Sequence, residues 1–241
     1  GYEKENFTKL AALTRPIAGG PERRLILWPE AAIPDFLDED DLEAADARAR
    51  IASLMQPGDV LLTGADKIFK KTIRFPGYIE NRWVGAANAT FALNAKGEIA
   101  WRYDKSHLVP FGEYLPMRKL LEPLGVARFV PGDLDFWPGK GAQSMRVGGL
   151  GPVPVKVGMQ ICYEIIFSGH VTDPEDRPDF IFNPSNDAWY GSWQPPQHLA
   201  MSRLRAIEEG LPVIRSTPTG ISAVIDANGN VQRQLPYNKP G

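Results

Sequence analysis

The sequence of 241 residues predicts an α/β fold, in which helices cover the faces of β-sheets. Short apolar runs of strand length alternate along the chain with segments whose apolar residues recur at every third or fourth position. Gly and Pro gather in loops directly after the apolar runs, and no internal repeat or low-complexity linker interrupts the pattern. Since a chain of this length can form one domain, we expect residues 1–241 to be a single catalytic domain.

The first predicted elements are a strand, a helix and a second strand. Residues 1–20 have the character of a helix end. Residues 24–28 form an apolar run that a proline ends, and residues 60–64 form another, each with the length of a buried strand. Between them, residues 36–55 place apolar side chains at helical spacing, with acidic residues near the start and a Pro-Gly pair after the end.

The rest of the chain predicts further strands and one well-marked helix. Residues 87–93 and 98–103 predict two strands, and residues 94–97 between them suit a hairpin turn. Residues 197–209 predict a helix, because apolar residues cover one broad side and prolines flank both ends. Other runs have the length of strands, namely 155–161, 180–183, 213–216 and 222–225.

Composition and motif content exclude several classes of function. Basic and acidic residues are interspersed, with a net charge of −2, so the sequence lacks the electrostatic character of a nucleic-acid-binding protein. No Gly-rich phosphate loop occurs, and the one Cys and three His residues lack the spacing of zinc ligands, so we expect no cofactor and no metal. No apolar stretch reaches the roughly 20 residues needed to span a bilayer.

The only cysteine, Cys162, stands where the apolar run 155–161 ends. It has no second cysteine in the sequence with which to form a disulfide. Unpaired cysteines are often small buried hydrophobic residues, and a thiol at a strand end is also a candidate nucleophile, so both interpretations stay open at this point. A thiol with an ordinary pKa of about 8.5 needs a neighbouring base or cation to react at neutral pH.

Charged residues at other predicted strand ends supply such groups. Glu30 follows the first predicted strand, where a carboxylate removed from water can act as a base, although a plain surface acid is the alternative. Lys105 ends another strand, where a fixed ammonium can stabilise an oxyanion or lower the pKa of a thiol. Glu113 lies in a loop rich in apolar and aromatic residues, and the nearby His107 is expected to have a structural role.

These residues, in this order, resemble a known catalytic triad. A Glu after Trp-Pro at Glu30, a Lys in Tyr-x-Lys-x-His-Leu at Lys105 and a Cys in Cys-Tyr-Glu at Cys162 are similar to the Glu-Lys-Cys triad of the nitrilase, or carbon-nitrogen hydrolase, superfamily. The resemblance covers most of the chain. More specific segments resemble the apolipoprotein N-acyltransferase branch of that superfamily, namely residues 27–34, 105–116 and 185–191.

The resemblance implies a four-layer α-β-β-α sandwich of the nitrilase type. Members of the branch carry this domain between membrane helices and begin it with a strand that precedes the first helix. Residues 1–20 show no such strand, and the sequence ends soon after Val231. We therefore expect the sandwich to lack its first strand and its last segment, and the chain to be part of a longer membrane protein.

The resemblance also implies a ping-pong acyl transfer in which Cys162 carries the acyl group as a thioester. Glu30 would be the base, and Lys105 would stabilise the tetrahedral oxyanion. The supporting positions of the family, around the lysine and the nucleophile, match three residues: Glu113, Tyr163 and Glu164.

The implied partners belong to a membrane. The acyl donor would be a phospholipid, with phosphatidylethanolamine as the expected one, and the acceptor would be the diacylglyceryl-cysteine at the N-terminus of a diacylated apolipoprotein. The implied location is the bacterial inner (cytoplasmic) membrane, with the catalytic domain on the periplasmic side. Two alternatives stay open: a soluble amidase that hydrolyses a small amide with the same triad, and a non-catalytic domain.

Some loop segments have the composition expected for contact with lipid. Residues 67–76 mix basic and bulky apolar side chains, as segments at a membrane surface do. Residues 129–132 and 136–139 combine aromatic residues with Pro-Gly pairs. We consider two roles for these aromatic segments: arms that gate the entry of acyl chains, or ordinary packing of loop residues.

Overall fold

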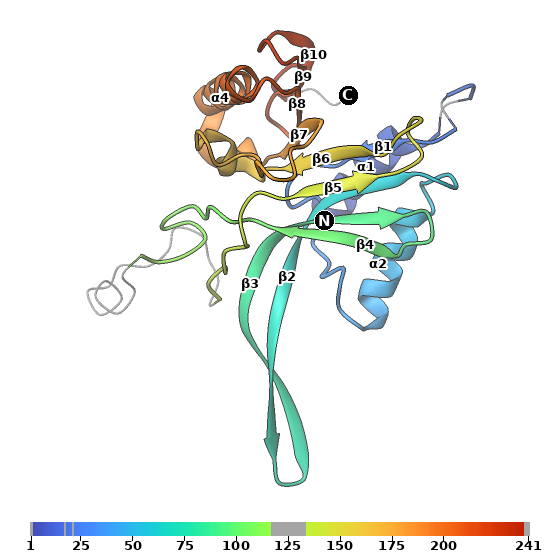
Figure 1. The fold of residues 1–241 in the computed structure, drawn as a ribbon. Coiled ribbons are helices and arrows are strands. Elements are labelled where there is room, and N and C mark those ends of the chain that lie inside the picture. Colours follow the sequence, from blue (N-terminus) through green and yellow to red (C-terminus); the bar gives the residue numbers. More distant parts are fainter. Residues whose placement is uncertain (1, 17, 21, 117–133, 239–241) are drawn as a thin grey trace.

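The computed structural model describes residues 2–16, 18–20, 22–116 and 134–238. Its core consists of two β-sheets that pack face to face, with helices on their outer sides (Figure 1). The predicted α/β class is therefore confirmed. The aromatic segment 129–132 lies outside the described residues.

The first sheet has the strand order β1 (Leu25–Leu27), β2 (Val60–Phe75), β3 (Tyr78–Asn94) and β4 (Ile99–Asp104). β1 is parallel to β2, and the other neighbours are antiparallel. The predicted turn at 94–97 joins β3 to β4, with Gly97 in the left-handed region at φ +77°. A residue without a Cβ atom adopts this conformation without steric cost.

Helix α2 (Leu42–Ala52) connects β1 to β2 and confirms the predicted strand, helix and strand. The helix begins later than the predicted range 36–55 because Asp41 caps it. The Asp41 carboxylate accepts a hydrogen bond from Ala44 N at 2.8 Å, which satisfies one of the backbone donors that a helix start leaves without a partner.

The second sheet has the strand order β10 (Val231–Leu235), β9 (Ser222–Ile225), β8 (Val213–Ser216), β7 (Phe180–Pro184), β6 (Val155–Met159) and β5 (Ser144–Val147). β6, β7 and β8 are parallel, and the outer pairs are antiparallel. β6 to β9 confirm the corresponding predicted strands. The sequence does not predict β5 or β10, because both are short and contain too few apolar residues to form a clear pattern.

Three buried clusters hold the layers together. The first lies between the first sheet and the helices α1 (Tyr2–Thr14) and α2, and includes Trp28. The second fills the space between the two sheets, where Leu62 and Phe182 are fully buried. The third lies between the second sheet and helix α4 (Gln194–Glu209), which begins three residues before its predicted start. The layers therefore follow the order helices, sheet, sheet, helix.

The hairpin of β2 and β3 is much longer than the predicted strands and projects from the body of the molecule (Figure 1). The predicted strands 60–64 and 87–93 form its buried base. In its outer half, Phe75 pairs with Tyr78, and most side chains on both strands are exposed. The sequence does not predict this outer half, because side chains exposed on both faces show no apolar alternation. Residues 67–75 therefore belong to β2, and Pro76 lies in the turn of this hairpin.

Candidate active site

The ends of strands β1, β4 and β6 bring the predicted acid, ammonium and thiol to one place where the two sheets meet. Glu30 follows β1 and is 7% exposed, and Lys105 directly follows β4 and is 2% exposed. Cys162 begins the short 3-10 helix η2 (Cys162–Ile166), which follows β6. The thiol lies within electrostatic reach of both Glu30 and Lys105.

The turn that carries Glu30 lies unusually close to strand β2. The carbonyl group of Pro29 accepts a hydrogen bond from Gly64 N at 3.1 Å. A Cβ atom at Gly64 would lie 2.5 Å from Ala31 N and 2.7 Å from Glu30 Cα, so only glycine permits this approach. The close contact holds the Glu30 carboxylate in its buried position.

Carboxylates surround the Lys105 ammonium. Lys105 Nζ lies 3.0 Å from Glu113 Oε1 and 3.4 Å from Glu30 Oε1. Asn88 Nδ2 donates to both carboxylates, at 2.8 Å to Glu30 and 3.0 Å to Glu113. Burial by itself would lower the pKa of Lys105, but the neighbouring anionic groups, Glu30 first among them, raise it above its ordinary value. The lysine side chain therefore stays charged at neutral pH.

Cys162 combines a strained backbone with a thiol that resists ionisation. Its φ is +48°, in the left-handed region that costs a non-glycine residue about 1–2 kcal/mol. Burial and the nearby charge of Glu30 raise the pKa of the thiol to about 12, although Lys105 opposes the shift. A thiol with this pKa is neutral at pH 7, so a nucleophilic role for Cys162 would require a base to take its proton.

Glu164 connects the loop after β4 to the turn that carries Cys162. Its buried carboxylate accepts hydrogen bonds from the Tyr103 hydroxyl at 2.8 Å, Ser106 N and Oγ at 2.7 Å, His107 N at 3.1 Å and Ile161 N at 2.7 Å. These donors come from the end of β4, from the loop after it and from the segment that follows β6. Glu164 therefore fixes the position of the lysine loop relative to the cysteine turn.

Aromatic rings pack beside the cysteine turn. The Tyr163 ring contacts Phe167 edge-on, with ring centroids 5.1 Å apart, and the His107 ring stacks on the same Phe167 at 4.4 Å. His107 Nδ1 also lies 3.3 Å from Ser106 Oγ. These contacts agree with a structural role for His107, and they place Tyr163 among the packing residues of the turn.

Two polar residues of the hairpin strands belong to the site although the sequence analysis did not select them. Asn88 bridges the two carboxylates, and Asp66 lies opposite Asn88 in the register of β2 and β3. Burial, with the charges of Glu30 and Glu113, raises the pKa of Asp66 to about 6. The available signal was the amide side chain of Asn88 within the mostly apolar predicted strand 87–93.

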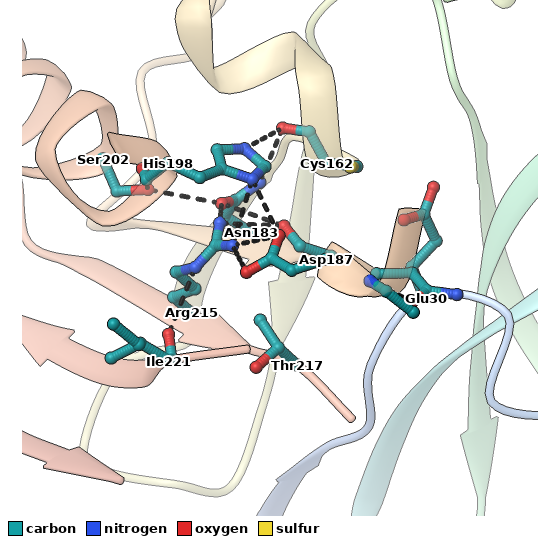
Figure 2. A network of polar contacts seen from close by, with 12 residues as sticks. Glu30, Cys162, Asn183, Asp187, His198, Ser202, Arg215, Thr217 and Ile221 are labelled. Carbon is teal, nitrogen blue, oxygen red and sulfur yellow. Dashed lines mark hydrogen bonds and ion pairs between the residues drawn. The ribbon is translucent and has the colours of Figure 1, made fainter. Parts of the chain in front are cut away.

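A buried polar network next to Cys162 also has no counterpart in the sequence analysis (Figure 2). Asp187 begins the 3-10 helix η3 (Asp187–Trp193), His198 lies on α4 and Arg215 lies on β8, and each is at most 5% exposed. Arg215 and His198 both contact the Asp187 carboxylate. These residues meet only when η3, α4 and β8 pack together, so spacing along the chain carries no sign of the network.

No cluster of His, Cys, Asp and Glu in the described part of the chain is suited to hold a metal ion. None of the described helices has both the length and the apolar character required to cross a membrane.

Known proteins resemble this chain over almost all of its length. The family model of the carbon-nitrogen hydrolases matches residues 2–241. An apolipoprotein N-acyltransferase of Rhizobium rhizogenes is 37% identical over 227 residues, which are 94% of this chain and 40% of that protein. One of Rhodopseudomonas palustris is 40% identical over 214 residues, which are 88% of this chain and 37% of that protein. The chain thus spans about 40% of the length of these relatives.

A solved structure agrees with the fold. XC1258 from Xanthomonas campestris, a CN-hydrolase superfamily protein with an arsenic adduct in its active site, superposes with a TM-score of 0.60 at 21% identity. The superposition covers 99% of this chain and 82% of that one. The two packed sheets with their outer helices therefore form an α/β fold of the nitrilase superfamily. The chain belongs to the carbon-nitrogen hydrolase family.

Proposed function

We propose that this chain is the acyl-transferring domain of an apolipoprotein N-acyltransferase. The observation that carries the proposal is the identity of 37% and 40% to two such enzymes, over 94% and 88% of this chain. The grouping of the buried Glu30 and Lys105 with the partly buried Cys162 supports it, because acyl transfer through a thioester needs a base, an oxyanion stabiliser and a nucleophile.

The proposal extends to the whole chain. We infer that residues 1–241 form one catalytic domain and that its layers are those of the four-layer α-β-β-α sandwich of nitrilase-type enzymes. The three separate core clusters support this inference, since each one joins two neighbouring layers.

In the first half-reaction, the Cys162 sulfur attacks the ester carbonyl carbon of a phospholipid, with phosphatidylethanolamine as the expected donor. Glu30 accepts the thiol proton while the carbon–sulfur bond forms, and Lys105 Nζ stabilises the oxyanion. The tetrahedral intermediate collapses to a Cys162 thioester. The departing lysophospholipid oxygen takes the proton from Glu30, so the base is ready for the second step.

In the second half-reaction, the α-amino group of a diacylglyceryl-cysteine at an apolipoprotein N-terminus attacks the thioester. Glu30 takes a proton from the amine, the amide bond forms and the carbon–sulfur bond breaks. The proton then passes to the Cys162 sulfur, which restores the thiol. Glu113, whose carboxylate lies 3.0 Å from Lys105 Nζ, positions the ammonium in both steps. Glu164 and Tyr163 support the turn that carries the nucleophile.

Both proposed substrates are held in a membrane. The proposal therefore implies the bacterial inner (cytoplasmic) membrane as the location, with the catalytic domain on its periplasmic side. The outer half of the β2–β3 hairpin supports contact with lipid, because it exposes Tyr78, Ile79 and Trp83 beside several basic residues.

The thioester is the intermediate that tests this function. After incubation with phosphatidylethanolamine, we expect intact-mass measurement to detect one acyl adduct, and Cys162→Ala to lack it. Because Cys162 is the only cysteine, the site of a thioester is unambiguous. Glu30→Gln is expected to slow adduct formation by about 10²–10⁴-fold. Glu43→Gln, which alters an exposed acid on α2, is the matched control.

The same experiment distinguishes the acyltransferase from the second candidate function, an amidase. An amidase with the same three residues would form no adduct with phospholipid and would hydrolyse small amides, with water as the acceptor. That combination of results would reject the acyltransferase and favour the amidase.

A further inference from the structure

Two buried side chains hold the backbone carbonyl group of Cys162 (Figure 2). His198 Nε2 lies 3.0 Å from the Cys162 oxygen, and Asn183 Nδ2 donates to the same oxygen at 3.3 Å. His198 is 5% exposed and Asn183 is fully buried. The peptide group after Cys162 is therefore held in one orientation. A non-glycine residue with φ of +48° keeps that conformation only where its surroundings enforce it.

The opposite edge of the imidazole ring shows which nitrogen carries the proton. His198 Nδ1 lies 3.0 Å from Arg215 Nη2, which can only donate, and 2.9 Å from Asp187 Oδ1. A proton on Nδ1 alone would leave the lone pair of Nε2 against the Cys162 oxygen, so that two acceptors would face each other. A proton on Nε2 lets His198 donate to the Cys162 oxygen, and Nδ1 then faces the Arg215 guanidinium together with the Asp187 oxygen that this guanidinium binds.

A doubly protonated ring is disfavoured at this position. Burial and the charge of Arg215 lower the pKa of His198, although Asp187 opposes the shift. Asp187 is already paired, because Arg215 Nη2 donates to its two oxygens at 2.7 Å and 2.5 Å. Burial and the Arg215 guanidinium therefore favour a neutral imidazole over the opposing effect of Asp187, and the Cys162 oxygen favours a proton on Nε2.

Arg215 also fixes the second side chain that holds the carbonyl group. Arg215 Nη1 donates to Asn183 Oδ1 at 2.8 Å, which leaves the Asn183 amide nitrogen directed at Cys162 and Gln160. One buried guanidinium thus orients both donors. In Figure 2 the Cys162 side chain points away from this network, toward the side on which Glu30 lies.

We propose that His198 is a positioning residue for the nucleophile. In its neutral form with the proton on Nε2, it holds the Cys162 carbonyl group and keeps the strained backbone in the conformation that directs the thiol toward Glu30. It acts through the backbone of Cys162 and not on the acyl group. The inference rests on the proposed role of Cys162 as nucleophile and does not depend on the acyl donor.

Two substitutions of His198 test the proposal in the full-length protein. The acyl donor is p-nitrophenyl butyrate, an activated ester that requires no lipid recognition. His198→Gln keeps an N–H donor near the place of Nε2, and His198→Leu removes it. Because small misplacement of a reacting group has a large effect, we expect His198→Leu to slow the burst of p-nitrophenolate about 10–100-fold, with KM changed less than about twofold. His198→Gln should stay within about threefold of the unaltered protein.

The control for these variants changes another residue of the same helix. Met201→Ala, on the exposed side of the same helix, should leave the burst unchanged. The positioning role is wrong if His198→Gln is as slow as His198→Leu. It is also wrong if the acylation rates of both variants fall only in proportion to their loss of thermal stability. If p-nitrophenyl butyrate acylates Cys162 but phospholipid does not, the proposed lipid donor is wrong and the role of His198 is still supported.

A spectroscopic measurement tests the proton position without any substrate. In protein labelled with ¹⁵N-histidine, the His198 signals are those absent from His198→Leu. At pH 7.5 we expect a protonated Nε2 and an unprotonated Nδ1. A proton on Nδ1, alone or together with Nε2, would overturn the proposal.

Discussion

Charge balance around Lys105 dominates the site at the scale of single residues. The Lys105 ammonium contacts the carboxylates of Glu30 and Glu113. The charges of both carboxylates also act on the nearby carboxyl group of Asp66. Burial disfavours the charge of Asp66, and the nearby carboxylates of Glu30 and Glu113 add to this cost. These effects raise the pKa of Asp66 to about 6.

Asp66 should make the stability of the protein depend on pH. Between pH 3.8 and about 6, the folded protein keeps a proton on Asp66 that the unfolded chain releases. Its stabilising contribution is therefore fully present below pH 3.8 and is lost as the pH rises through 6. We expect Asp66→Asn to increase the free energy of unfolding at pH 7.5, by at most about 3 kcal/mol.

Denaturant unfolding of both proteins between pH 4 and pH 8 measures this effect. The stability difference between Asp66→Asn and the unaltered protein should shrink toward pH 4. A difference that is the same at both ends of this range would contradict the assigned pKa.

Glu164 should be the residue whose amide replacement is most costly near the site. Its carboxylate accepts from backbone and side-chain donors, and the amide nitrogen of a glutamine would face some of these donors. We expect Glu164→Gln to lower the free energy of unfolding by about 2–4 kcal/mol. Urea unfolding, with the exposed Glu43→Gln as control, measures the loss. Equal stability of the two variants would show that the buried carboxylate is not needed for the fold.

The β2–β3 hairpin is the most distinctive element. Phe75 and Tyr78 stack at its outer end with ring centroids 4.8 Å apart. Nearer its base, the Trp137 ring stacks on Phe69 with ring centroids 4.8 Å apart. The indole also packs directly on Gly85, where an added Cβ atom would lie 2.3 Å from the ring. Phe136 and Trp137 thus pack against the hairpin and Gly139 against the end of β4, which supports the packing role, while the gating of acyl chains stays a prediction.

Contact with lipid should depend on the exposed apolar residues of the hairpin. We expect the combined substitution Tyr78→Ser, Ile79→Ser and Trp83→Ser to weaken binding to vesicles of phosphatidylethanolamine and phosphatidylglycerol at least about tenfold, because apolar area no longer leaves water. Co-sedimentation measures the binding. Leu42→Ser, at an equally apolar and 90% exposed position on α2, is the control. Equal losses in both variants would reject the hairpin as a specific contact.

At the scale of the whole molecule, the site depends on how the two sheets pack. Glu30 and Lys105 follow strands of the first sheet, and Cys162 follows a strand of the second. The cluster between the sheets, which includes the fully buried Phe182, sets the distance between these groups. Packing far from the chemistry therefore controls the alignment of the three residues.

Phe182→Ala should weaken both stability and acylation. A cavity between the sheets is expected to lower the free energy of unfolding by about 3–5 kcal/mol. Acylation of Cys162 should slow even at temperatures where the protein stays folded. Val153→Ala, at a 68% exposed position, should change stability by less than about 0.5 kcal/mol. A stable Phe182→Ala variant with full activity would disprove the dependence on sheet packing.

Much of this organisation could be predicted because its signals are local. The apolar runs before Glu30, Lys105 and Cys162 predict strands, and polar or turn residues mark where each strand ends. The outer hairpin and β10 were not predicted, since strands that expose both faces or contain mostly polar residues have no apolar pattern. Pairing with neighbouring strands stabilises them, and that pairing is not a local property.

The sequence by itself determined the α/β class, most strands, the family and the three residues expected to carry the chemistry, because periodicity and short motifs are properties of neighbouring residues. Only the tertiary structure decided which groups surround them. Asn88 bridges two carboxylates, and His198 reaches the Cys162 carbonyl group. Such contacts join residues that are distant in the chain, and hydrogen bonding requires their atoms to come within about 3 Å, which only the packing of sheets and helices achieves.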